Sequence, residues 1–310
     1  MKAMIFPGQG IQKQGMGRDL YAAFESARWI FDTADQISGQ KLLHAMFDGQ
    51  EKELSKSVNA QPAIFVYQVA LASAQNSVVP DVVAGHSFGE FAALVVAGSV
   101  SFEEAFRLVL TRAALTHDLA EASADMAMAA VIGLADDEVE SALGSLSEDM
   151  KSSVYVANYN GPGQIVLSGL RAAVAAACAQ MKRLGARRAV MLPIEGAFHT
   201  PMVGFIGQAL EKEIKSLNII TPQIPICQCA TASIAYDAET IRKNLVAHPT
   251  SPVNWTVMTN SLVQFGAEKF YEVGTDDTLQ KIVRRMYPAK RVGSLLHEDC
   301  YYGVVRDYSV

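Results

Sequence analysis

The sequence lacks any apolar run long enough to form a membrane-spanning helix. Half of its 310 residues are hydrophobic, but polar residues interrupt every stretch of the ~20 residues that a bilayer requires. The apolar N-terminus is broken early by Pro7 and Gly8. That is too short for the apolar region of a signal peptide, and it predicts a first buried strand instead. We therefore expect a globular cytoplasmic protein that does not bind membranes.

Cysteine and excess positive charge are also lacking. The four cysteines (Cys178, Cys227, Cys229 and Cys300) form no C-x-x-C pair, so we expect reduced thiols and no metal site built on them. Cys227 and Cys229 alternate within a strand-like run, a pattern that favours packing over metal binding. The formal net charge of −6 argues against general binding to nucleic acid.

The most informative stretch that is present is GHSFGE at residues 85–90. It follows an apolar run at 81–84 that predicts a buried strand, and it precedes a run at 91–97 that predicts a helix. In this context G-x-S-x-G places a serine oxygen on a sharp, exposed turn. The positive end of the helix points at that serine, and the backbone N–H of Phe88 can stabilise an oxyanion. The stretch predicts a nucleophilic Ser87; the alternative is an idle serine in a glycine-rich turn.

The order of elements predicts an α/β fold with a second unit inserted into the first. Strand and helix signals alternate over residues 1–120, as expected for a parallel sheet covered by helices. Residues 125–195 instead predict the order βαββαβ of a ferredoxin-like unit. We expect a large domain of residues 1–124 and 196–296, this small domain between them, and a tail or linker stub at 297–310. The predicted strands include 126–132, 154–157, 164–168, 188–193, 224–229 and 269–273, and the predicted helices include 62–75, 101–120, 136–143, 171–184 and 278–286.

A nucleophilic serine needs a base, and His199 is the best placed of the six histidines. It stands directly before Thr200 and Pro201, which predict a helix start with a capping threonine and a proline at the first position. The positive end of that helix disfavours an imidazolium, so the ring would stay neutral and able to accept a proton. A structural loop histidine is the alternative, and no Asp or Glu can be named as a third member. We expect His86 to shape the turn.

An arginine lies at the centre of an apolar helix face. Ser101 and Glu104 form a capping box that predicts a helix to about Ala120, and apolar residues at helical spacing surround Arg112. Because an unpaired buried charge is costly, Arg112 needs an anionic partner. The pattern leaves two interpretations open: an internal salt bridge, or a bidentate fork for a substrate carboxylate.

Taken together, these motifs resemble a known family. The motifs GQG at 8–10, QP at 61–62, GHSFGE at 85–90, Arg112, FH at 198–199 and SPVNW at 251–255 occur in the order and spacing of malonyl-CoA:acyl carrier protein transacylases. The resemblance covers residues 1–296 and is strongest to the stand-alone, trans-acting acyltransferases of polyketide synthases. It implies an α/β fold with a hydrolase-like large domain, a parallel sheet and an inserted ferredoxin-like small domain.

The resemblance also implies catalytic roles. Ser87 would be the nucleophile and His199 the base. The backbone N–H groups of Gln9 and Phe88 would form the oxyanion hole, and Arg112 would hold the malonyl carboxylate.

Four further positions bear on the pocket. By the same resemblance Gln61 lines it, and Phe198 would crowd an α-methyl branch and so favour a malonyl group. His248 stands where a glutamine is common, and in the family the backbone carbonyl of that residue orients the catalytic imidazole. Thr116 stands where a methionine is usual, which leaves the acyl specificity open.

The implied reaction is a ping-pong acyl transfer that needs no cofactor and no metal. A malonyl group would pass from malonyl-CoA to Ser87 and then to the phosphopantetheine thiol of an acyl carrier protein, in polyketide or fatty acid biosynthesis. The first alternative is an acyl hydrolase of the same fold that clears acyl groups from carrier proteins. Arg112 argues against it, because a plain acyl chain gives that charge no partner. An ordinary esterase and a catalytically idle docking domain are less favoured.

A basic cluster on the small domain is the candidate docking site for the carrier protein. It consists of Lys182, Arg183, Arg187 and Arg188. Carrier proteins of this class are typically acidic, so the cluster would complement them despite the net negative charge. The alternative is a solvated helix end whose cations favour the C-terminal dipole.

Overall fold

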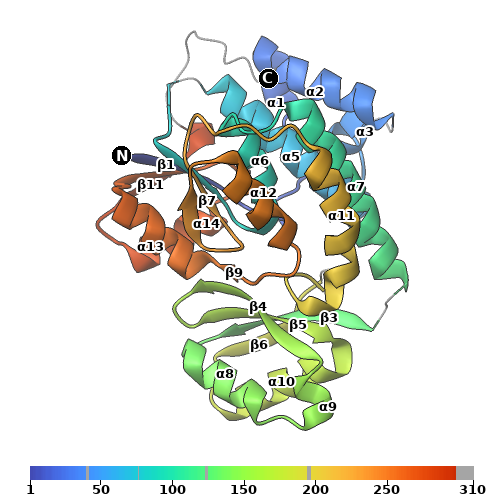
Figure 1. Cartoon of the computed structure of the whole chain (residues 1–310), viewed down its shortest axis with the longest axis vertical. Helices are drawn as coiled ribbons and strands as arrows, with labels where there is room; N and C mark the ends of the chain where they lie inside the picture. The colour runs from blue at the N-terminus through green and yellow to red at the C-terminus, as the bar shows by residue number, and fades with distance from the viewer. Residues whose placement is uncertain (40–41, 76, 123–124, 194–196, 298–310) are drawn as a thin grey trace.

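The structure, a computed structural model, describes residues 1–39, 42–75, 77–122, 125–193 and 197–297, and it contains two β-sheets (Figure 1). The larger sheet has six strands in the order β11-β10-β1-β2-β7-β8. Neighbouring strands are parallel except for the edge pair β7 and β8. The strands are β1 (Lys2–Phe6), β2 (Val82–Gly85), β7 (Ile226–Gln228), β8 (Ser233–Ala235), β10 (Lys269–Glu272) and β11 (Arg291–Ser294).

Strand β1 shows why the centre of this sheet is continuously apolar. Successive side chains of a strand point to opposite faces, so Met4 and Phe6 join the core on one face, and Ala3 and Ile5 join the core on the other. A parallel sheet covered on both faces needs apolar residues at every position. The run that the N-terminal sequence predicts as a buried strand is therefore confirmed.

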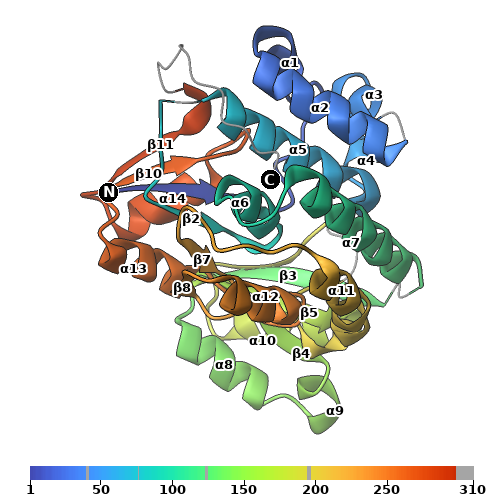
Figure 2. The same ribbon diagram turned by 45° about the horizontal axis from the view of Figure 1, so that its top comes forward.

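Helices cover both faces of the larger sheet (Figure 2). The core on one face is formed with α5, α6, α7, α11 and α12, and helices α1 to α4 pack outside α5. The other face packs against α13 and α14. The bounds are α1 (Arg18–Ala23), α2 (Glu25–Ser38), α3 (Leu42–Phe47), α4 (Glu51–Leu54), α5 (Ser57–Ala74), α6 (Glu90–Val96), α7 (Phe102–Ala122), α11 (Gly204–Ser216), α12 (Ala238–Ala247), α13 (Trp255–Phe265) and α14 (Thr278–Met286), with 3₁₀ turns η1 (Ser87–Gly89), η2 (Pro201–Val203) and η3 (Leu295–His297).

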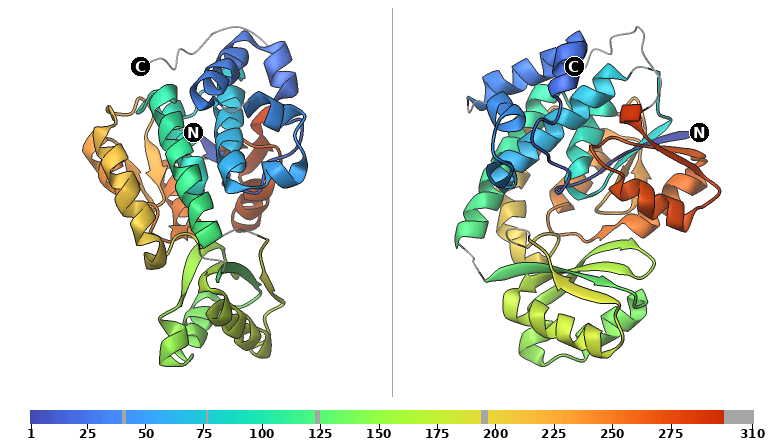
Figure 3. Two further views of the ribbon diagram at one scale, coloured as in Figure 1. Left: turned by 90° about the vertical axis from the view of Figure 1, so that its right-hand side faces the viewer. Right: turned by 180° about the vertical axis from the view of Figure 1, so that it is seen from behind.

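The smaller sheet forms a separate layer below the larger one (Figure 3). Its order is β6-β3-β5-β4-β9, and its first four strands pair antiparallel. Along the chain these elements follow the order β3-α8-β4-β5-α10-β6, so the predicted ferredoxin-like unit is confirmed. The bounds are β3 (Met126–Ile132), α8 (Asp136–Gly144), α9 (Glu148–Lys151), β4 (Val154–Gly161), β5 (Gln164–Leu170), α10 (Arg171–Arg183), β6 (Arg188–Met191) and β9 (Val253–Asn254).

Three features differ from what the sequence predicts. Residues 1–120 do not simply alternate, because five helices lie between β1 and β2. Helix α5 begins at Ser57 and carries Pro62 inside it, whereas the proline suggested a start. The fifth strand of the small sheet, β9, comes from outside residues 125–195 and pairs parallel with β4. Of the tail expected at 297–310, all but His297 lies outside the described residues.

No helix among the described residues has the length and apolarity needed to cross a membrane. The described cysteines (Cys178, Cys227 and Cys229) are free and buried, and burial raises the pKa of each thiol. This agrees with the packing role predicted for Cys227 and Cys229.

Candidate active site

The GHSFGE stretch forms the predicted strand–turn–helix. Strand β2 ends at Gly85, Ser87 takes the positive φ of 51°, and α6 starts at Glu90. Both glycines are required by close contacts: a Cβ at Gly85 would lie 2.0 Å from the backbone nitrogen of Glu90, and one at Gly89 would lie 2.1 Å from the carbonyl oxygen of Phe6. A left-handed backbone at a non-glycine residue is uncommon and points to a functional turn.

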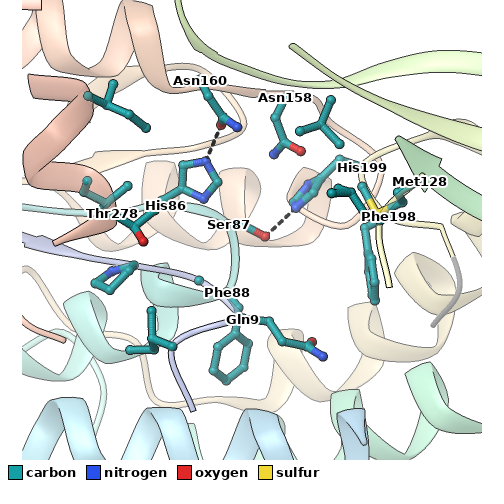
Figure 4. A pocket seen from close by; sticks show the side chains of 18 of the residues that line it. Gln9, His86, Ser87, Phe88, Met128, Asn158, Asn160, Phe198, His199 and Thr278 are labelled. Carbon is teal, nitrogen blue, oxygen red and sulfur yellow. Dashed lines mark hydrogen bonds between the residues drawn. The ribbon is translucent and has the colours of Figure 1, made fainter. Parts of the chain in front are cut away.

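The turn brings Ser87 against His199. The Ser87 Oγ lies 2.6 Å from Nε2 of His199 (Figure 4). On the other side of the ring, Nδ1 of His199 lies 3.0 Å from the carbonyl oxygen of Ser251. A carbonyl only accepts, so Nδ1 carries the proton and Nε2 is free to accept the serine proton. The pair thus has the geometry of a nucleophile and its base.

Burial lowers the pKa of His199 well below its ordinary value. His199 is 3% exposed, and the nearby His248, Arg112 and His86 lower its pKa further. The imidazole therefore stays neutral at neutral pH, as a proton acceptor must. The local backbone agrees in part with the sequence: Thr200 accepts from the N–H of Met202, but it opens the 3₁₀ turn η2 before α11.

The expectation that the backbone carbonyl of His248 orients the His199 imidazole is wrong. The carbonyl that faces His199 belongs to Ser251. His248 is fully buried, and its side-chain Nε2 lies 3.0 Å from the carbonyl oxygen of Ser87. His248 ends α12, so its position relative to the turn depends on how α12 packs, which sequence spacing does not report.

Arg112 is buried with no ion pair among the described residues. It is 5% exposed, and Nη1 donates to Oε1 of Gln61 at 2.6 Å. The guanidinium lies over the rings of Phe88, Phe91 and Phe198, 5.3 to 5.9 Å from their centroids. Burial lowers its pKa only to about 10, so the side chain remains a cation. This arrangement leaves the internal salt bridge without support and favours the fork for a substrate anion.

Ser87, His199 and Arg112 face one cavity of about 300 Å³, which Gln9, Phe88 and Phe198 also line. The loop before Gln9 runs against the turn, since a Cβ at Gly8 would lie 3.0 Å from the carbonyl oxygen of His86. The expectation that Gln61 lines the pocket is wrong: Gln61 is completely buried behind the lining, where it accepts from Arg112. Thr116 is buried too and does not belong to the lining.

The small domain and α14 supply a further part of the cavity wall, which sequence reasoning missed. Met128, Asn158, Asn160, Gln164, Val166 and Leu192 come from the small sheet and its continuation, and Thr278, Leu279 and Ile282 come from α14. Asn160 also bonds His86, with 2.7 Å between Oδ1 and Nε2 (Figure 4). Asn158 and Asn160, two amide side chains near the end of β4, are the one sequence signal for this wall.

Glu90, Cys229 and His248 place potential metal-ligating atoms near one another beneath the turn. The polar atoms of Glu90 and Cys229 already have other partners: both carboxylate oxygens of Glu90 accept N–H groups, from Gln228 and Cys229, and Cys229 donates to the carbonyl of Gly85. Burial raises the pKa of Glu90 to about 7, which weakens it further as a ligand. The cluster fits a structural support for the turn better than a metal site.

The four residues of the basic cluster are all exposed. Lys182 and Arg183 lie in the last turn of α10, and none of the four forms an ion pair within the described residues. Ile132 pairs with Arg188 on one side and with Gln164 on the other. Since strands lie ~4.8 Å apart, the cluster is about 10 Å from a residue that lines the cavity.

Comparisons with known proteins agree with this geometry. The acyl transferase domain profile matches residues 3–295. The chain is 32% identical over 286 residues to the malonyl CoA-acyl carrier protein transacylase of Bacillus subtilis, covering 92% of this chain and 90% of that protein. It is 36% identical over 284 residues to that of Staphylococcus aureus strain MRSA252, covering 92% of each.

Solved structures give the same result. An acyl carrier protein S-malonyltransferase from Vibrio cholerae matches with a TM-score of 0.89 and 31% identity, over 94% of this chain and 96% of that one. A malonyl-transacylase solved in complex with its type II PKS acyl-carrier protein matches with a TM-score of 0.89 and 31% identity, over 94% and 95%. With its serine–histidine pair, its buried arginine and this likeness along nearly its whole length, the chain belongs to the acyl transferase domain family, together with the malonyl CoA-acyl carrier protein transacylases.

Proposed function

We propose that this protein transfers a malonyl group from malonyl-CoA to the phosphopantetheine thiol of an acyl carrier protein, by way of a malonyl ester on Ser87. The observation that carries the proposal is Arg112, a buried cation that has no anionic partner in the described part of the chain and faces the same cavity as Ser87. A malonyl group has the free carboxylate that this cation lacks. A hydrolase of plain acyl chains would leave the charge unpaired.

The first half-reaction follows from the contacts at Ser87. His199 accepts the hydroxyl proton at Nε2 while the oxygen attacks the thioester carbonyl. The N–H groups of Gln9 and Phe88 are the proposed donors to the tetrahedral oxyanion. The carbonyl of Ser251 holds the protonated Nδ1 side of the ring, so that the imidazolium can return its proton to the leaving thiolate of CoA.

The second half-reaction reverses these steps with a new thiol. The pantetheine thiol of the carrier gives its proton to His199 and attacks the ester, while Arg112 keeps the malonyl carboxylate in place. We expect Phe198, against the guanidinium, to disfavour an α-methyl branch. All groups in this scheme belong to the chain or its substrates, so the proposal includes no metal or cofactor. The pathway, polyketide or fatty acid, depends on the carrier, and a cytoplasmic location suits both substrates.

Intact-mass measurement tests the intermediate. Protein mixed with malonyl-CoA should carry one malonyl group, which the Ser87→Ala variant should not acquire, and addition of carrier protein should move that group to the carrier. No adduct on the parent protein would contradict the ester. An adduct that is lost to water as fast with the carrier as without it would instead favour the hydrolase.

A further inference from the structure

The side chain of His248 makes contacts that the proposed mechanism does not use. It is completely buried beneath the turn that carries the nucleophile. Its Nε2 lies 3.0 Å from the carbonyl oxygen of Ser87, which can only accept, so the imidazole must donate an N–H there. This fixes the tautomer of the ring and ties α12, whose end it forms, to the backbone of Ser87.

That hydrogen bond acts on Ser87, which together with His199 has a left-handed backbone conformation in the site. Ser87 is one of three described non-glycine residues with positive φ, a conformation that persists only where the surroundings enforce it. Its carbonyl also accepts from the backbone N–H of Glu90, so the imidazole supplies a second constraint on the same oxygen. The direction of the Ser87 carbonyl sets the direction of the following N–H, that of Phe88, because the two belong to one planar peptide unit.

The same ring also supports the base. The His248 and His199 rings lie 5.4 Å apart at 75°, edge to face, and Phe91 packs on His248 at 5.6 Å and 77°. Burial lowers the pKa of His248 to about 3, so the ring that packs on His199 is neutral at neutral pH. One side chain thus touches the nucleophile's backbone and the base's ring.

We propose that the His248 side chain is a positioning residue for acyl transfer, with its Nε2–H fixing the carbonyl of Ser87 and its ring supporting the ring of His199. The inference rests on the proposed function only for the identity of the acyl substrate, because the contacts of His248 do not depend on that substrate. The other ring nitrogen, Nδ1, is buried without a hydrogen-bond partner among the described residues. An unpartnered buried polar atom lowers stability, so this histidine is better explained by its contact with the active site than by packing.

Substitutions at His248 distinguish the role of its N–H donor from the role of the space that its side chain fills. His248→Gln keeps a side-chain N–H that can reach the Ser87 carbonyl, whereas His248→Leu and His248→Met fill the space without a donor. We expect the apolar variants to melt at or above the parent temperature, yet to acylate Ser87 roughly 10- to 100-fold more slowly, because small misplacements of reacting groups are this costly. The glutamine variant should stay within about threefold of the parent, and KM for malonyl-CoA should change little in all three.

Two readouts keep the inference distinct from the proposed function. Single-turnover acylation by malonyl-CoA depends on the substrate, while the rate of labelling by a fluorophosphonate reports the reactivity of Ser87 without it. If no malonyl ester forms on the parent, the function fails, but the labelling rates still decide the role of His248. Parent-like labelling in both apolar variants overturns the inference, as does equal loss in the glutamine and the apolar variants. If one apolar variant does not fold, the other provides the comparison.

Discussion

At the scale of the residue, Arg112 decides which acyl group the site accepts. We expect Arg112→Ala to lower kcat/KM for malonyl-CoA by about 100-fold, because two charge-assisted hydrogen bonds together contribute about 3 kcal/mol. The kcat/KM for acetyl-CoA, which has no carboxylate, should not fall, so the preference for malonyl-CoA over acetyl-CoA should decrease. Steady-state rates with both thioesters measure the effect.

Arg107→Ala is the matched control, since Arg107 is exposed on the same helix and should leave both rates unchanged. Equal losses for malonyl-CoA and acetyl-CoA in the Arg112 variant would show that the arginine is structural.

The pH dependence of acylation reports the environment of His199. The neutral imidazole is the active form, and burial lowers its pKa well below the ordinary value. A histidine with a pKa of about 6.5 would be only about a quarter neutral at pH 6, but we expect the single-turnover acylation rate at pH 6 to remain near its value at pH 8. A fall centred on pH 6.5 would contradict this environment.

The free energy of unfolding should depend on pH through His199 and His248, and it should fall as the pH falls. His199 and His248 both have lowered pKa values in the folded state, so the unfolded chain binds their protons first. Their contribution to stability is therefore present above about pH 6.5 and is lost as the pH falls below it. The same sign is expected for both residues because both are buried as neutral rings.

Single residues were the part of the site best predicted from sequence. Ser87, His199 and Arg112 do lie around one cavity, because motif context and helical periodicity each constrain one side chain locally. His248 was placed correctly near the site but with the wrong contact. Which of its groups faces Ser87 depends on the packing of α12 against the turn, a contact between residues 161 positions apart.

At the scale of the element, the strand–turn–helix around Ser87 depends on close backbone approach. Gly89→Ala would place a Cβ 2.1 Å from the Phe6 carbonyl, so β1 and α6 must separate. We expect a loss of about 3 kcal/mol in the free energy of unfolding, by analogy with overpacking, and little acylation. Urea denaturation and the acylation assay measure both effects.

Gly144→Ala provides the control, because Gly144 lies exposed in α8 with nothing within 4 Å of a new Cβ. It should raise stability by about 0.5 kcal/mol and leave acylation unchanged. A Gly89→Ala protein with parent stability would contradict the close contact.

Elements with a strong local pattern were predicted well. Half of the capping box at Ser101 and Glu104 is present: the Glu104 N–H donates to the Ser101 hydroxyl, while the Glu104 carboxylate accepts from that hydroxyl instead of from the Ser101 N–H. Helix α14 has the predicted bounds. The misses lie where tertiary contacts override local signals: α5 continues through Pro62 because nearly all of its residues are buried. Strand β9 has only two residues, too few for any periodicity to predict.

At the scale of the whole molecule, the cavity lies between the two sheets, and charge at its edge should guide the partner. The double substitution Arg187→Glu and Arg188→Glu should raise KM for an acidic carrier protein roughly tenfold, as expected when complementary charges are reversed. Self-acylation from malonyl-CoA should not change, because both residues lie outside the cavity lining. Kinetics at varied carrier concentration and ionic strength provide the measurement.

The double substitution Lys52→Glu and Lys212→Glu is the control for total charge, since both lysines are exposed in the large domain, on α4 and α11. Equal effects from the control, or equal losses of acylation and carrier transfer in the double variant, would contradict docking at the basic cluster.

The whole-molecule arrangement was the least accessible to sequence. The order of strand and helix signals predicted the two units and their sequence along the chain, because each unit has its own succession of strands and helices. The cavity wall, however, combines the small sheet with α14, and no local pattern specifies how two separately patterned units face each other.

The pairing of β4 with β9 bears on attempts to exchange parts between relatives. Asn158 and Tyr159 pair with Val253 and Asn254, two residues beyond the Ser251 carbonyl that holds His199. A chimaera that swaps only residues 125–193 would join a foreign edge strand to the resident β9 and alter the support of the base. Recombination that aims to change which carrier is used should therefore transfer residues 251–255 along with the small domain. The transferred segments then include the backbone carbonyl that accepts from the catalytic histidine.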